Sequence, residues 1–292
     1  MRLQRNRPGR GFTLLEMAFA TAITALVVLG VMVTFLSHYR SYRAHRALRD
    51  MQQSARTALE AVSRDVRMAG YGVTVPDSQL SSWITWVSDI TNNPTVHNGG
   101  SGQGRDALSI VAAFGPPLAS LSQPAISNAI ALHVGSGEGA RFNTSDKSVI
   151  FIGRLETARI VSLTGDILTV SVDPDMAGKG LRWDYPVGTP VELVEVATYE
   201  WYDGTNAYPH HPCLLRDDHH GVLSMAWQKM VAGNVEDFQV QELFYSLNVD
   251  ISVRAGEAEQ NYTNPDRGDH FRRLTVGTRI LPRNTPLLKL RY

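Results

Sequence analysis

Glu16 is an acidic residue inside a long apolar stretch, residues 11–36, which reads GFTLLEMAFATAITALVVLGVMVTFL. A carboxylate at the centre of a bilayer costs about 3 kcal/mol on insertion scales, and less where the side chain reaches the headgroups. A buried carboxylate is also tolerated when a cation meets it in the same low-dielectric layer. Glu16 therefore has two interpretations: a side chain that extends to the membrane surface, or one that pairs with a positive charge.

A second group of chemically active side chains lies in residues 208–221, YPHHPCLLRDDHHG. Imidazole and thiolate groups are ligands of zinc and copper. Their spacing matches no zinc pattern, and adjacent histidines in a strand point to opposite faces. We therefore expect a polar loop or hairpin here and no cofactor, with metal binding as the alternative. The metal-ligand candidates are His210, His211, Cys213, His219 and His220.

The element that must hold Glu16 is the apolar segment 12–36. About 25 helical residues measure roughly 37 Å, and a bilayer core of about 30 Å needs roughly 20 apolar residues, so the segment predicts a membrane span. A basic leader, residues 1–11, precedes it with four arginines and no acidic residue, which favours a cytoplasmic N-terminus. A removable secretory signal fits poorly, because apolar sequence continues beyond the small residues Ala18 and Ala20.

Residues 37–69 predict an amphipathic continuation of the same helix, without glycine or proline. Apolar residues recur there at spacings of three and four, which is typical of one buried stripe. Gly70 then fits the position after a helix end, where a left-handed conformation is needed. The stripe consists of Ala44, Leu48, Met51, Ala55, Leu59, Val62 and Val66, and a row of arginines comprises Arg40, Arg43, Arg46 and Arg49.

Residues 70–292 predict one β-rich globular domain. Two apolar runs, 158–163 and 167–172, flank Thr164-Gly165-Asp166 and indicate a hairpin. One long helix followed by mainly antiparallel sheet defines an α+β fold. Further strands are expected at 107–114, 129–134, 148–152, 191–202, 237–245 and 273–281.

The composition and the motifs argue against several classes of function. The chain has 28 basic and 28 acidic residues, so nothing favours nucleic-acid binding, which would need a basic excess. The sequence carries no G-x-S-x-G motif and no P-loop, and we expect a protein that is not an enzyme. Cys213 is the single cysteine, which excludes an intrachain disulfide.

The basic leader, the segment Gly11-Phe12-Thr13-Leu14-Leu15-Glu16 and the apolar helix together resemble the signal of type IV pilins and type II secretion pseudopilins. The resemblance implies that a prepilin peptidase and N-methyltransferase cuts between Gly11 and Phe12 and methylates Phe12. It also implies that Glu16 neutralises the N-terminal amine of a neighbouring subunit during assembly. The expected location is the inner membrane, single-pass with the C-terminal domain in the periplasm, and then the pilus or cell surface.

Residues 62–71, VSRDVRMAGY, resemble the helix end of PilW-like minor pilins, and 231–241, VAGNVEDFQVQ, resemble a strand of the same group. This implies a minor pilin that helps to start type IV pilus assembly at the pilus tip, with roles in adhesion and twitching motility. The implied partners are other minor pilins, the major pilin, the inner-membrane assembly machinery and a large pilus-tip adhesin. Many major pilins contain a cysteine pair, which this chain lacks.

Two alternatives remain open from the sequence. A J-type pseudopilin of type II secretion shares the N-terminal pattern but is usually shorter. A membrane-anchored periplasmic metal-binding domain would use the histidine-rich segment 208–221. Metal analysis would distinguish the second alternative, and neighbouring genes the first.

Overall fold

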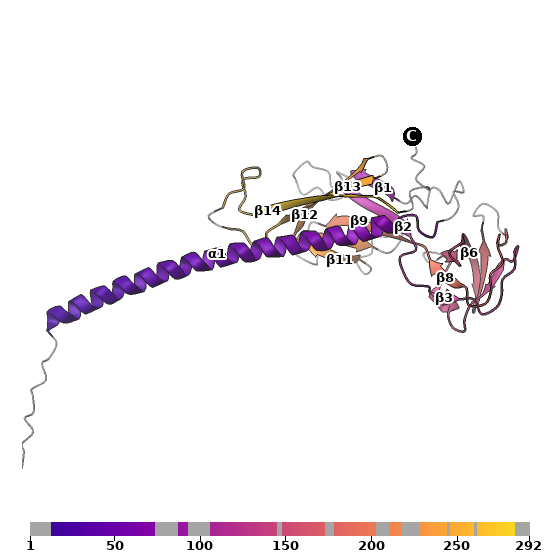
Figure 1. The fold of residues 1–292 in the computed structure, drawn as a ribbon, viewed down its shortest axis with the longest axis horizontal. Coiled ribbons are helices and arrows are strands. Elements are labelled where there is room, and N and C mark those ends of the chain that lie inside the picture. Colours follow the sequence, from indigo (N-terminus) through magenta and orange to yellow (C-terminus); the bar gives the residue numbers. More distant parts are fainter. Residues whose placement is uncertain are drawn as a thin grey trace, which may run out of the picture. The chain divides into compact units, whose positions relative to one another are not determined.

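The computed structural model confirms the α+β fold, with one long helix and mainly antiparallel sheets (Figure 1). The chain forms two compact units, Met1–Asp50 and Met51–Tyr292, and each is described by itself. The described residues are 13–73, 87–92, 106–144, 148–172, 178–202, 211–217, 228–243, 246–259 and 262–283.

Helix α1 runs from Leu14 to Met68 and contains 55 residues. It ends where Gly70 adopts a φ of 76°, a left-handed conformation that glycine reaches without steric cost. The N–H of Gly70 donates to the carbonyl of Val111 at 2.9 Å, which ties the helix end to strand β2 (Asp106–Ala112). The helix end that the sequence predicts at Gly70 is confirmed.

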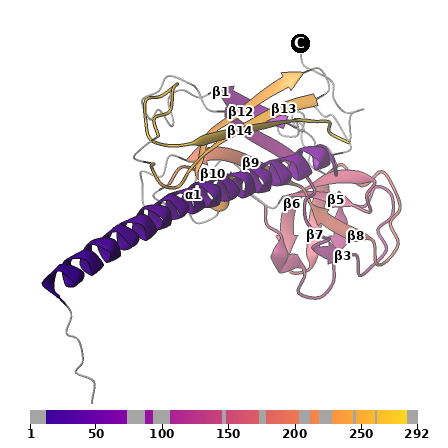
Figure 2. The same ribbon diagram turned by 60° about the vertical axis from the view of Figure 1, so that its left-hand side comes forward.

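In the second unit, α1 buries the apolar residues Met51, Ala55, Ala58, Val62 and Val66. Four of these five belong to the stripe predicted from the sequence, and Ala58 adds a position to it. Figure 2 shows this part of the helix beside strand β9 (Glu195–Tyr202). From Met51 on, the stripe is part of the hydrophobic core of the second unit, with Leu59 half-buried. Its first two members differ, because Ala44 is only half-buried and Leu48 is exposed.

Asp65 is buried on the same part of the helix, with 1% of its surface exposed. Its Oδ2 accepts a hydrogen bond from the Tyr199 hydroxyl at 2.7 Å and one from Nε of Arg216 at 2.7 Å. Tyr199 lies in β9 and Arg216 in β10 (Cys213–Asp217). Burial and the nearby carboxylate of Asp65 raise the pKa of Tyr199. These bonds attach the helix to two neighbouring strands.

Two antiparallel sheets pack in this region. The five-stranded sheet has the order β1-β2-β9-β10-β11, and the three-stranded sheet has the order β12-β13-β14. Trp201 of β9 links them, because its indole N–H donates to the carbonyl of Val235 in β12 at 2.7 Å. The remaining bounds are β1 Val87–Asn92, β11 Gln228–Gly233, β12 Val235–Leu243, β13 Ser246–Arg254 and β14 Arg273–Ile280.

A six-stranded antiparallel sheet, β3-β8-β5-β6-β7-β4, has a hydrophobic core of its own. It contains the predicted hairpin, formed by β6 (Glu156–Thr164) and β7 (Ile167–Ser171), and Gly165 takes the left-handed turn position with a φ of 59°. The other strands are β3 Ala119–Ser120, β4 Ala131–His133, β5 Val149–Ile152 and β8 Pro190–Leu193.

The single strand predicted at residues 191–202 is wrong. The segment forms two strands in different sheets: β8 pairs with β3 and β5, whereas β9 pairs with β2 and β10. The chain changes sheets at Val194, which is buried and whose N–H donates to the carbonyl of Val149 at 2.9 Å. The sequence carries a local signal for this change: apolar and acidic residues alternate in Val191-Glu192-Leu193 and again in Val194-Glu195-Val196, so the alternation changes phase between Leu193 and Val194.

Candidate functional site

Thr13 and Glu16 form a reciprocal pair at the N-terminal end of α1. Glu16 Oε2 accepts hydrogen bonds from the backbone N–H of Thr13 at 2.9 Å and from its hydroxyl at 3.1 Å. The Thr13 hydroxyl oxygen in turn accepts a bond from the N–H of Glu16 at 3.3 Å. The sequence Thr-x-x-Glu before an apolar run is the pattern of a capping box, which satisfies N–H groups that the first helical turn leaves unpaired.

Glu16 thus caps the first turn of its own helix, a role that we did not predict from its charge. The signal was present in the sequence, because Thr13 precedes Glu16 by three residues. Only Oε2 is used in the capping box, and Oε1 accepts no hydrogen bond from any described residue. One carboxylate can therefore cap its own helix and still offer an oxygen to another group.

The part of α1 that carries Glu16 makes no core within its own chain. Every residue from Thr13 to Arg43 is exposed. Within the described residues, α1 is the one helix that is long and apolar enough to cross a membrane, and its most apolar window has none of its residues buried. Such a surface is stable only where lipid or other apolar chains cover it.

The threonines of this segment satisfy their own hydroxyl groups. The hydroxyls of Thr21, Thr24 and Thr34 donate to the carbonyls of Met17, Ala20 and Gly30 at 3.0, 2.8 and 2.9 Å, respectively. Because each acceptor lies four residues earlier on the same helix, no donor needs water. The segment is thus compatible with a hydrocarbon environment despite its threonines.

Aromatic and basic side chains follow the apolar segment. The rings of Phe35 and Tyr39 are stacked with centroids 6.4 Å apart, and the guanidinium of Arg43 lies 5.6 Å from the Tyr39 ring centroid. Aromatic rings and basic groups are enriched at membrane–water interfaces. These residues lie where the C-terminal end of a membrane span that begins near Glu16 is expected to meet the membrane–water interface.

The histidine-rich segment falls partly outside the described residues, which exclude His210, His219 and His220. His211 is exposed, whereas Cys213 is completely buried in β10. Burial raises the pKa of the Cys213 thiol to about 11, which disfavours the thiolate that binds metals. Among the described residues, no group of three or more His, Cys, Asp or Glu side chains could hold a metal ion.

Comparison with known proteins finds a family match for the N-terminal segment. A family model described as the prokaryotic N-terminal methylation motif matches residues 6–32. The match covers Gly11, Phe12 and Glu16, although Gly11 and Phe12 lie outside the described residues. No curated protein and no solved structure matches the chain. The motif and the exposed apolar helix support a membrane-anchored protein of the type IV prepilin-like class, which includes pilins and pseudopilins.

Proposed function

We propose that this protein is a PilW-like minor pilin that helps to start type IV pilus assembly and occupies the pilus tip. The observation that carries the proposal is the methylation motif at the start of a helix whose apolar residues are all exposed through Arg43. A helix of this kind needs an apolar environment supplied first by the membrane and then by neighbouring subunits. The role is structural, and the enzymatic steps are performed on the protein by its peptidase and methyltransferase.

In this proposal, cleavage between Gly11 and Phe12 removes the leader and creates an amine on Phe12. Thr13 stays in the mature chain, so the capping box with Glu16 is kept. Glu16 Oε1, which the capping box does not use, then accepts the amine of a neighbouring subunit. Pairing of the two charges in a layer with little water lowers the cost of burying each of them.

The partners follow from this role. Before assembly the protein spans the inner membrane once, with residues 70–292 in the periplasm. It assembles there with other minor pilins, and this complex accepts the major pilin and a large tip adhesin through the inner-membrane machinery. The β-rich unit then lies on the surface of the pilus.

Two substitutions at Glu16 separate charge pairing from helix capping. Glu16→Gln keeps an acceptor for the Thr13 N–H but removes the negative charge, whereas Glu16→Ala removes both. We expect both variants to be cleaved normally, to co-purify poorly with partner pilins and to give fewer surface filaments. Intact-mass measurement of membrane-extracted protein is the control, because it shows that residues 1–11 have been removed.

The outcomes distinguish the alternatives. If Glu16→Gln assembles normally and Glu16→Ala does not, Glu16 acts by capping and the charge-pairing mechanism is wrong. If both assemble normally, the assembly role of Glu16 is excluded. Co-purification with secretion-system pseudopilins instead of type IV pilins would replace the PilW-like assignment by the J-type pseudopilin.

A further inference from the structure

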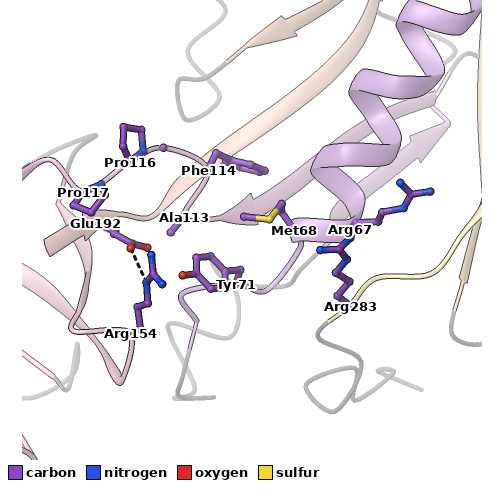
Figure 3. Close-up of a pocket in the computed structure, with 11 residues that line it drawn as sticks. Arg67, Met68, Tyr71, Ala113, Phe114, Pro116, Pro117, Arg154, Glu192 and Arg283 are labelled. Carbon is purple, nitrogen blue, oxygen red and sulfur yellow. Dashed lines mark hydrogen bonds and ion pairs between the residues drawn. The ribbon is translucent and has the colours of Figure 1, made fainter. Parts of the chain in front are cut away.

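A pocket of about 360 Å³ lies where five separate segments of the second unit meet (Figure 3). The end of α1 contributes Arg67 and Met68, and the chain after β2 contributes Phe114 and the two prolines that follow it. The loop after β5 supplies Arg154, and the chain after β14 supplies Arg283. The two prolines are Pro116 and Pro117, β8 contributes Glu192, and the remaining lining residues are Tyr71, Ala113 and Gly115.

On one side of the pocket, the positive and the negative side chain form an ion pair with each other. Nε of Arg154 donates to Oε1 of Glu192 at 3.1 Å, and the Glu192 side chain is only 3% exposed. Burial and the negative charge of the nearby Glu192 carboxylate raise the pKa of Tyr71. The single carboxylate of the pocket is therefore already occupied by its own neighbours.

Two further guanidinium groups line the other side, and the part of the chain that the structure describes offers neither of them an acidic partner. The backbone N–H of Arg283 donates to the carbonyl of Arg67 at 3.2 Å, which holds these residues next to each other. Both are exposed, and no described carboxylate pairs with either side chain. Figure 3 shows both side chains on the same side of the pocket. The lining side chains consequently have a net charge of +2, concentrated where no described carboxylate neutralises it.

The wall between the two sides is apolar and exposed. Phe114 and Met68 are half-buried, and Pro116 and Pro117 are exposed. Proline has no N–H, so this stretch presents ring carbons instead of hydrogen-bond donors. An aliphatic side chain can pack on such a wall while an adjacent carboxylate reaches the arginines. Arginine suits this recognition because its planar group binds carboxylates through two parallel hydrogen bonds.

We propose that this pocket binds a short acidic segment of a partner protein. An Asp or Glu carboxylate lies between Arg67 and Arg283, and a flanking aliphatic side chain packs against Met68, Phe114 and Pro117. The volume is at the lower end of the range for ligand pockets, about 300–1,000 Å³, and suits one or two side chains. The inference goes beyond the proposed role in pilus assembly and rests on the pocket alone.

The test uses the full-length protein in detergent and two capped peptides, acetyl-Leu-Asp-Leu-amide and acetyl-Leu-Asn-Leu-amide. Isothermal titration measures binding to the parent, to the double variant Arg67→Gln/Arg283→Gln, and to Arg159→Gln. Arg159 is exposed on β6 outside the pocket, so Arg159→Gln removes a positive charge from a different part of the surface. We expect the Asp peptide to bind at least tenfold more tightly than the Asn peptide, and the double variant to lose that difference. Arg159→Gln should bind like the parent.

A second variant protects the test against misfolding. Pro117→Asp adds a carboxylate at the exposed pocket rim and should weaken binding of the Asp peptide without changing the melting temperature. Equal binding of both peptides, or unchanged binding by the double variant, would overturn the proposal. Inorganic phosphate that competes as strongly as the Asp peptide would show a general anion site, and would overturn the assignment to an acidic peptide.

Discussion

The two parts of α1 differ in how their side chains are covered. From Thr13 to Arg43 every residue is exposed, although the segment contains the most apolar sequence of the chain. From Met51 to Val66 the sequence is far more polar, yet its apolar stripe and Asp65 are buried. Hydrophobicity alone therefore does not determine which part of a helix joins the core of its own chain.

The pattern of polar groups explains the difference. In the first part, threonine hydroxyls donate to carbonyls of the same helix, so these hydroxyls need no hydrogen-bond acceptor from another element. In the second part, Asp65 bonds to β9 and β10 and fixes one helix face against particular residues. The hydroxyl groups of the first part thus fix it to no other described element, whereas Asp65 fixes the second part to one sheet.

The largest effect is expected from Asp65→Ala. It leaves the Arg216 guanidinium, 15% exposed, without its 2.7 Å partner and removes the acceptor of the Tyr199 hydroxyl. Loss of one member of a buried ion pair costs about 3–5 kcal/mol of unfolding free energy. Urea unfolding followed by tryptophan fluorescence measures it, because Trp201 is buried in the same unit.

A matched variant at an exposed acidic residue of the same helix, between these two parts, is Asp50→Ala. Asp50 lies 3.9 Å from Arg46, and both side chains are about 70% exposed, so the change should stay within about 0.5 kcal/mol. Equal losses for the two variants would contradict the comparison between the two parts of α1.

An intermediate effect is expected from Val62→Ala. Val62 is 0% exposed, and removal of two buried carbon atoms at about 0.8 kcal/mol each, with a residual cavity, predicts a loss of about 2 kcal/mol. Val33→Ala is the control, because Val33 is 61% exposed within the chain and should leave unfolding of the second unit unchanged. A comparable loss for Val33→Ala would show that the first part also contributes to that core.

The smallest effect is expected from Thr13→Ala, which removes the capping hydroxyl. Substitution of an N-cap residue typically costs about 1 kcal/mol, confined here to the first turn. Hydrogen exchange should accelerate at the amides near Glu16 and stay unchanged after residue 51. Thr57→Ala serves as the control, since its hydroxyl only bonds back to Gln53 at 2.9 Å. Slower or unchanged exchange at the first turn would exclude the capping box in solution.

The sequence predicted those features that depend on neighbouring residues. The helix end at Gly70 and the hairpin around Gly165 are local, because each depends on a glycine with a left-handed conformation. The capping box at Thr13 was equally local and could have been found from the spacing alone. The fold class also followed, since one long periodic segment precedes short strands.

Features that join distant residues could not be predicted in this way. Asp65 looks like a solvent-facing acid until Arg216, which follows it by 151 residues, lies beside it. The change of sheet at Val194 depends on a hydrogen bond to Val149, 45 residues earlier, and the segment 191–202 alone does not identify that partner. The pocket at Arg67 and Arg283 likewise exists only because the end of the helix and the chain after β14 meet.

The continuity of α1 has a mechanical consequence. The helix contains no proline and a single glycine, Gly30, so its hydrogen-bond ladder is unbroken from Leu14 to Met68. Tension applied along such a helix is carried by the ladder and passes into the sheet where Asp65 is bonded to Tyr199 and Arg216. Under pulling, those two bonds share the load between strands β9 and β10, so the junction between helix and sheet resists extension more strongly than either bond would alone.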